Sequence, residues 1–233
     1  MTQSVAYWAV VPAAGVGKRM QADRPKQYLP LLAKTVIEQT LARLLSVPEF
    51  KAVVVSIADT DPYWPDLEIA QHPKVKTAPG GKERADSVLS GLHLIREQAQ
   101  DDDWVLVHDA ARPCITASDV TKLIQTLAED PVGGILALAS HDTLKSVHAG
   151  VITGSVKREE IWRALTPQMF RYGRLKTALE QAEGNSAITD EASAIELLGF
   201  QPKIVAGRAD NIKITSPEDL ALAQFYREQQ SHD

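Results

Sequence analysis

Apolar runs of strand length alternate with amphipathic stretches of helix length along most of this chain. The strand-like runs cover residues 5–11, 52–57, 104–107, 133–139, 203–206 and 212–215. The stretches with apolar residues at helical spacing cover residues 35–46, 83–99, 119–128, 175–182 and 191–198. A last helix follows Ser216, an N-cap residue that forms a capping box with Asp219. This alternation predicts one α/β domain, spanning residues 1–233, with a mostly parallel sheet.

Residues 143–157 interrupt the alternation. They contain β-branched residues and two glycines but show no helical period, so we expect an extended hairpin that protrudes as a β-arm. An arm with little core of its own usually packs on another subunit, although a surface loop would also explain the pattern. The predicted fold is therefore a single Rossmann-like α/β domain with a protruding β-arm.

The segment 10–26 is rich in small residues and cations directly after the first predicted strand. It is not a P-loop, because an arginine follows the lysine where Ser or Thr is required. It is not a dinucleotide fingerprint either, because the third glycine is missing. Gly15 and Gly17 alone fit an ordinary strand-to-helix turn. With the cations Arg19 and Lys26 beside them, they favour an anionic ligand such as a nucleoside triphosphate.

Ligands of parallel sheets bind at the carboxyl ends of the strands. The loop after the predicted strand 104–107 carries Asp109 and Arg112, so we expect both to lie at the same edge as Arg19. A carboxylate in this position can hold Mg²⁺ together with phosphate oxygens, and Asp210 is a second candidate. Each aspartate alone fits a cap or a turn equally well.

Two lysines and a second glycine pair are further candidates for contacts with a nucleotide. Lys26 and Lys213 are candidates for phosphate contacts, and Lys213 lies in the predicted strand 212–215, where a buried lysine needs an anionic partner. Gly81 closes a glycine pair before a helix whose first N–H groups are free, and Ser87 could bond a base or a ribose. Alternatively, the lysines are ordinary solvated surface charges, the glycines are loop residues and Ser87 is a solvated helix residue.

Composition narrows the function classes. The 233 residues carry a formal charge of −5, from 25 basic and 30 acidic residues, which argues against nucleic-acid binding. The single cysteine, Cys114, excludes a disulfide within the chain and fits a small buried side chain. His108 and Asp109 are adjacent, but the Gly-x-Ser-x-Gly elbow of a hydrolase triad is missing.

The lengths of the apolar runs indicate in which compartment we expect the protein. The N-terminal run is short and has no preceding Lys or Arg, so it fits a buried strand rather than a signal peptide. No apolar stretch reaches the length of a membrane span. We therefore expect a cytoplasmic protein.

Eight motifs occur in a fixed order over nearly the whole chain. They are PAAGVGKRM from Pro12, PKQY from Pro25, GKERADSV from Gly81, VHDAARP from Val107, DTLK from Asp142, LTPQ from Leu165, ITDEAS from Ile188 and GRADNIK from Gly207. This set resembles the 2-C-methyl-D-erythritol 4-phosphate cytidylyltransferase family, of the methylerythritol phosphate route to isoprenoids. The glycine loop alone marks many sugar nucleotidyltransferases, whereas the combination is far more specific.

The resemblance implies a reaction and a site. CTP and 2-C-methyl-D-erythritol 4-phosphate would give CDP-methylerythritol and pyrophosphate, with Mg²⁺ or another divalent cation, in a homodimer whose arm is residues 143–157. Catalytic cations are implied at Arg19, Lys26 and Lys213, and metal contacts at Asp109 and Asp210. The residues implied for CTP are Pro12, Ala13, Ala14, Gly15, Gly17, Arg19, Lys26, Gly81, Ser87, Asp109 and Ala110. Those implied for the second substrate are Arg112, Thr143, Arg158, Thr189, Asp210 and Lys213, with Thr143 and Arg158 supplied by the partner's arm.

Two other functions remain open from the sequence. A ribitol 5-phosphate cytidylyltransferase would use the same nucleotide loop, although the segments after Thr143 favour methylerythritol phosphate. A non-catalytic nucleotide-binding module would not need Lys26, Asp109 and Lys213 around one phosphate region. Lys82 departs from the small or acidic residue expected of the family.

Overall fold

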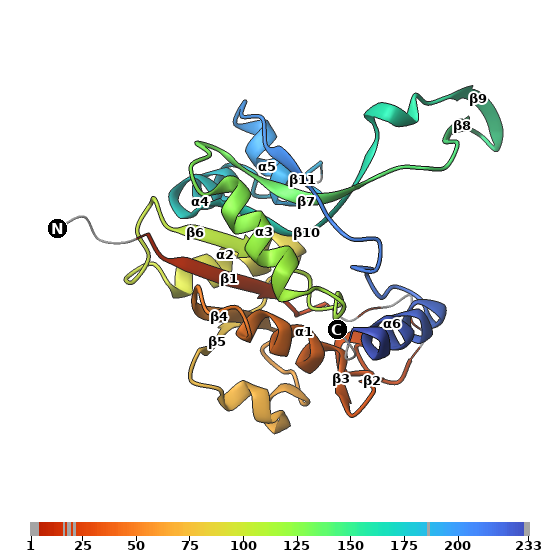
Figure 1. Ribbon diagram of the computed structural model, residues 1–233. Helices are drawn as coiled ribbons and strands as arrows, with labels where there is room; N and C mark the ends of the chain where they lie inside the picture. Colours follow the sequence, from red (N-terminus) through yellow and green to blue (C-terminus); the bar gives the residue numbers. More distant parts are fainter. Residues whose placement is uncertain (1–4, 16, 18–19, 21, 186, 231–233) are drawn as a thin grey trace.

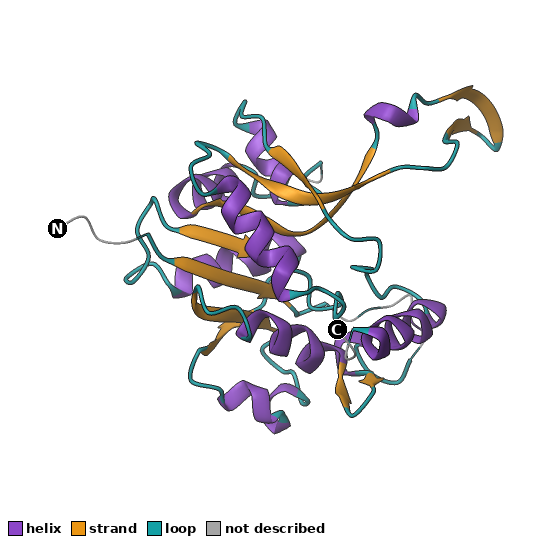
Figure 2. Cartoon of the chain, in the orientation of Figure 1, coloured by secondary structure: helices purple, strands orange, loops and turns teal. Residues whose placement is uncertain are grey.

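A seven-stranded sheet forms the centre of the computed structural model, which describes residues 5–15, 17, 20, 22–185 and 187–230 (Figures 1 and 2). In spatial order the strands are β11 (Lys203–Ala206), β7 (Gly133–Ala139), β10 (Trp162–Arg171), β6 (Trp104–Val107), β1 (Tyr7–Pro12), β4 (Phe50–Ile57) and β5 (Val75–Pro79). All neighbours are parallel except that β10 is antiparallel to both β6 and β7. The predicted α/β fold with a mostly parallel sheet is confirmed.

Helices cover both faces of the sheet (Figure 1). One layer contains α1 (Val36–Leu45) and α3 (Ala117–Leu127), and the other contains α2 (Arg84–Leu94), α4 (Tyr172–Gln181) and α5 (Glu191–Leu197). Strand β1 serves both layers, because successive side chains of a strand point to opposite faces. Ala9 and Val11 are buried with α1 and α3, whereas Trp8 and Val10 are buried with α2, α4 and α5.

The last helix, α6 (Pro217–Gln229), lies beside a two-stranded ribbon and closes a smaller apolar cluster (Figure 1). The ribbon consists of β2 (Pro30–Leu31) and β3 (Lys34–Thr35). Ser216 and Asp219 form the predicted capping box, with Pro217 as the first helical residue. Short 3-10 turns lie at Lys26–Tyr28, Trp64–Asp66, Glu68–Gln71 and Arg158–Glu160.

A hairpin projects from the body of the molecule (Figure 1). It pairs β8 (Lys145–His148) with β9 (Val151–Ser155) in antiparallel orientation, as the sequence predicted for an arm. Val147, Val151 and Ile152 on this hairpin are between 59% and 66% exposed. Such exposure of branched apolar side chains is typical of a surface that a partner covers.

Two predicted elements differ from the observed ones, and two strands of the sheet were not predicted. Residues 212–215 form no strand, because Ile214 N–H donates to Ala111 O in a loop (2.9 Å) instead of joining the sheet. The helix predicted to reach residue 99 ends at Leu94. Strands β5 and β10 were missed, since β5 is a polar edge strand and β10 contains Pro167, which interrupts its pairing with β7.

None of the helices in the described ranges combines the length and the apolar composition needed to span a bilayer.

Gly133 is required where β7 begins. Its φ is +111°, and a Cβ there would lie 2.2 Å from the backbone oxygen of Met169 on β10. We expect Gly133→Ala to lower the free energy of unfolding by about 3 kcal/mol, because both the backbone and the strand pairing must shift. Gly154→Ala in the arm is the control and should stay within about 0.5 kcal/mol, since no atom lies within 4 Å of its added Cβ. Urea unfolding measures both, and equal losses would contradict this explanation.

Candidate active site

A cavity of about 370 Å³ opens beside the carboxyl ends of β1 and β6. Its walls come from the loop after β1, the start of α2, the loop after β6 and the segment before α6. The residues that line it are Pro12, Ala13, Ala14, Gly15, Gly17, Lys26, Gln27, Gly81, Lys82, Glu83, Arg84, Ser87, Asp109, Ala110, Ala111, Lys213 and Thr215. All residues that the resemblance implied for CTP are among them except Arg19, which lies outside the described residues.

A buried glutamine is hydrogen-bonded to the loop after β1. Gln27 Nε2 donates to the carbonyl oxygens of Ala13 (2.7 Å) and Gly15 (3.0 Å). The neighbouring Lys26 lines the cavity, and its Nζ donates to Ile214 O (2.8 Å). The loop after β1 is therefore tied to the segment that carries Lys213.

The opposite wall approaches this loop closely at Gly80. A Cβ on Gly80 would lie 2.2 Å from the Cβ of Ala14, so a side chain here would push the two walls apart. Ser87 shapes the same wall, because its Oγ accepts from Gly81 N (3.0 Å) and donates to Glu83 O (3.2 Å). The hydroxyl predicted to contact the base or ribose thus also fixes the turn before α2.

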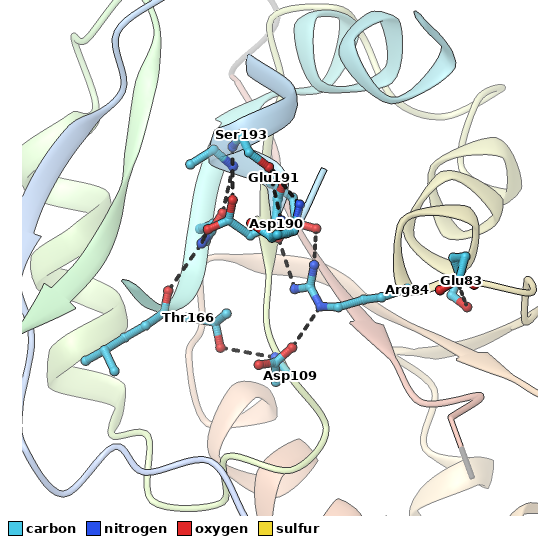
Figure 3. Close-up of polar contacts among 12 residues, drawn as sticks. Glu83, Arg84, Asp109, Thr166, Asp190, Glu191 and Ser193 are labelled. Atoms are coloured by element: carbon cyan, nitrogen blue, oxygen red, sulfur yellow. Dashed lines mark hydrogen bonds and ion pairs between the residues drawn. The ribbon is translucent and has the colours of Figure 1, made fainter. Parts of the chain in front are cut away.

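Asp109 is the buried anion of the cavity. Its Oδ1 accepts from Arg84 Nε at 3.0 Å (Figure 3). Its Oδ2 lies 2.9 Å from Lys213 Nζ and 3.4 Å from Arg112 Nε. Burial alone would raise the pKa of this carboxyl, but the positive charges of Arg84, Lys213 and Arg112 outweigh burial and hold the pKa well below its ordinary value. Asp109 is therefore ionised throughout the physiological pH range.

Arg84 joins Asp109 to a second buried carboxylate. Its Nη1 and Nη2 donate to the two oxygens of Glu191 at 2.6 and 3.0 Å, and Figure 3 shows the guanidinium between the two acids. Burial disfavours the charged guanidinium, yet Glu191 and Asp109 together raise the pKa of Arg84. Two helices and one strand end meet at this side chain, since Arg84 begins α2, Glu191 begins α5 and Asp109 follows β6.

His108 and Thr166 support the backbone of Asp109. Asp109 N donates to Thr166 Oγ1 (3.1 Å), and Thr166 Oγ1 lies 3.0 Å from His108 Nδ1. His108 Nε2 faces the carbonyl oxygen of Arg112 (3.2 Å), which can only accept, so we assign the imidazole proton to Nε2. Burial lowers the pKa of His108 to about 4, and this neutral, fully buried ring is unsuited to a hydrolase triad.

The family follows from comparison with known proteins. The sequence profile of the 2-C-methyl-D-erythritol 4-phosphate cytidylyltransferases matches residues 7–229. The chain belongs to this family. A protein of that name from Vibrio atlanticus (strain LGP32) is 56% identical over 229 residues, which cover 98% of both chains. Another from Pseudomonas aeruginosa (strain UCBPP-PA14) is 56% identical over 222 residues, covering 94% of this chain and 95% of the relative.

Solved structures agree with this family assignment. A crystal structure of a 4-diphosphocytidyl-2C-methyl-D-erythritol synthase is similar with a TM-score of 0.84 at 35% identity, covering 97% of this chain and 100% of that one. The Francisella tularensis 2-C-methyl-D-erythritol 4-phosphate cytidylyltransferase gives a TM-score of 0.83 at 34% identity, covering 95% and 99%. The resemblance found from the motifs is therefore confirmed.

The donor set at Asp109 fits the divalent cation that this cytidylyltransferase family implies. An ionised carboxylate offers about four acceptor positions, and the three cations occupy three of them. Within the described ranges no group of three or more His, Cys, Asp or Glu side chains could hold a metal ion. Mg²⁺ commonly uses one carboxylate with phosphate oxygens and water, so Asp109 suits an ion that shares the nucleotide.

Asp210, the second aspartate predicted for metal, has other partners. Arg208 donates to both of its carboxylate oxygens (3.0 and 2.6 Å), and Gln230 Nε2 donates to Oδ2 (3.1 Å). It does not line the cavity that contains Asp109. Its predicted metal contact stays a prediction.

Of the residues predicted for the second substrate, Lys213 is the one that lines the cavity. The sequence predicted Lys213 in a buried strand, and that prediction was wrong, because Lys213 lies in a loop. Its side chain is 36% exposed and pairs with Asp109. Arg112 is buried and donates through Nη1 to Asn211 O (2.7 Å). Thr189 is exposed near α5, and Thr143 and Arg158 are exposed at the base of the arm. Their predicted contacts stay predictions.

Sequence reasoning assigned no role to Gln27, Arg84, Thr166 or Glu191. All four lie within the motifs that carry the family resemblance, which was the available signal. Their spacing along the chain reveals nothing of their contacts, because each acts on a segment far away in sequence, such as Glu191 on Arg84.

Replacement of Asp109 tests the charge balance of this site. Asp109→Asn would leave three cations around an uncharged group, and we expect a loss of about 3–5 kcal/mol in the free energy of unfolding. A carboxyl with a lowered folded pKa contributes this stability at every pH above its ordinary value of 3.8 and loses it as the pH falls further. Urea unfolding at about pH 7 and pH 5 should therefore give the same difference between wild type and variant. A difference that shrinks at pH 5 would contradict the lowered pKa.

Proposed function

We propose that this protein transfers the cytidylyl group of CTP to 2-C-methyl-D-erythritol 4-phosphate and releases pyrophosphate. One observation carries the proposal beyond family membership. An ionised aspartate surrounded by Arg84, Arg112 and Lys213 lines a cavity walled by small residues, with Lys26 at its edge. Such a site suits a flat base and the phosphates of a nucleotide.

The reaction brings two anions together. A phosphate oxygen of the second substrate attacks the α-phosphorus of CTP in line, and the bond to pyrophosphate breaks. The attacking oxygen is already negative, so no general base is required, and the neutral, buried His108 is not used as one. The protein instead has to orient both substrates and stabilise negative charge as it develops.

Lys26 and Lys213 are suited to this stabilisation. Both line the cavity, and their ammonium groups are anchored by Ile214 O and Asp109 respectively, so they need little reorganisation when a triphosphate enters. Arg19 is the third cation that we assign to the phosphates. Asp109 would hold Mg²⁺, which supplies charge neutralisation on the phosphate oxygens when bound.

We propose that the working form is a homodimer in the cytoplasm, where CTP is available. Thr143 and Arg158 flank the hairpin β8–β9 and do not line the cavity of their own subunit. The exposed Val147, Val151 and Ile152 give the hairpin an apolar surface for a second copy. An arm that reaches across to the partner would bring Arg158 to the second substrate.

Pyrophosphate release from CTP and 2-C-methyl-D-erythritol 4-phosphate, with and without Mg²⁺, tests the function. Metal-dependent release with this substrate and not with ribitol 5-phosphate is expected. Release with ribitol 5-phosphate instead would reassign the substrate and keep the mechanism. CTP binding without release from either substrate would contradict an enzymatic role.

Subunit mixing tests the shared site. Lys26→Ala and Arg158→Ala should each be nearly inactive alone, because each damages both sites of its own dimer. Mixed dimers would contain one intact site, so an equal mixture should recover about a quarter of wild-type activity after subunit exchange. Pyrophosphate release before and after exchange measures this. No recovery, although mixed dimers form, would mean that each subunit is self-sufficient.

A further inference from the structure

We propose that Arg84 is a positioning residue that sets the orientation of the Asp109 carboxylate and is itself held by Glu191. The proposal rests on the proposed cytidylyl transfer and adds residues to it. Figure 3 shows the arrangement, with Arg84 extended from the start of α2 toward both acids. The three side chains come from α2, α5 and the loop after β6.

The guanidinium of Arg84 uses one edge for each partner. Nη1 and Nη2 donate to Glu191 at 2.6 and 3.0 Å, and Nε donates to Asp109 Oδ1 at 3.0 Å. Because the guanidinium is planar, the two bonds to Glu191 fix the direction in which Nε points. A lysine has one ammonium group in place of this fork and cannot hold both acids in the same way.

Glu191 makes a fixed anchor. Its side chain is 1% exposed, and removing one partner of a buried ion pair is strongly destabilising. It is also the first residue of α5, where the helix dipole favours a negative charge. Arg84 is therefore anchored on the side away from the cavity, although its side chain is 27% exposed and lines the cavity wall.

Asp109 is pulled from two directions. Oδ1 accepts from Arg84, whereas Oδ2 lies near Lys213 and Arg112. Without Arg84, Oδ1 loses its partner and the carboxylate is held only by the two cations at Oδ2, so its orientation in the cavity is no longer fixed. Arg84 thus acts through Asp109 and need not touch either substrate.

Charge and positioning make opposite predictions for Glu191→Gln and the same direction for Arg84→Gln. Arg84→Gln removes a positive charge beside the cavity, while Glu191→Gln removes a negative one. If Arg84 mattered only through its charge, the first variant would weaken CTP binding and the second would strengthen it. If Arg84 positions Asp109, both variants lower kcat by about 10- to 100-fold, and the double variant is no worse than the more damaged single variant.

Mn²⁺ binding in the presence of CTP, followed by electron paramagnetic resonance, gives a readout that does not require turnover. Both single variants should bind Mn²⁺ about 10- to 100-fold more weakly than wild type. Arg84→Lys, which keeps the charge, should behave like Arg84→Gln in this titration. If the wild-type protein releases no pyrophosphate, the proposed function is wrong. The Mn²⁺ titration would still decide whether Arg84 positions Asp109.

Lys203→Gln is the matched control for a merely structural loss. Lys203 Nζ lies 2.6 Å from Asp130 Oδ2, whose side chain is 4% exposed, at the amino end of β7 and away from the cavity. This variant removes a cation from a buried carboxylate outside the cavity, so it should leave kcat and Mn²⁺ binding unchanged. The proposal is overturned if Arg84→Gln keeps kcat and Mn²⁺ affinity within twofold of wild type, or if the two glutamine variants shift them in opposite directions.

Discussion

The ion pairs around Asp109 are the interaction on which the rest of the site depends. Burial at the end of β6 would by itself favour the neutral acid. Arg84, Arg112 and Lys213 reverse that preference, and each comes from a different segment of the chain. The same contacts that keep Asp109 ionised therefore also join the start of α2, the loop after β6 and the segment before α6 around one cavity.

The fold supplies these segments because parallel strands place their carboxyl ends at one edge of the sheet. β1 and β6 are neighbours, so the small residues after β1 and Asp109 after β6 share a wall. The antiparallel β10 lies beside β6 and brings Thr166 to the backbone of Asp109. A charged cluster with an excess of cations at this edge is suited to two anionic substrates in a member of the cytidylyltransferase family.

Much of the fold, and many of the residues that line the cavity, could be predicted from the sequence for a physical reason. Apolar periodicity reports burial directly, and loops that follow buried strands must lie at the sheet edge. This argument placed Asp109 and Arg112 at the same edge as Arg19 in the prediction. Partners remote in sequence leave no such pattern. Arg84 with Glu191, and Lys213 in a loop instead of a strand, depend on tertiary contacts that periodicity does not encode. β10 was missed for a local reason, since a proline within a strand argues against the strand.

The most direct test of this account is a crystal structure of the protein with CTP and Mg²⁺. The account predicts the base between the loop after β1 and the start of α2, the triphosphate against Lys26 and Lys213, and the ion shared between phosphate oxygens and Asp109. A triphosphate bound away from Asp109, with its ion pairs to Arg84 and Lys213 unchanged and no ion beside it, would contradict the account.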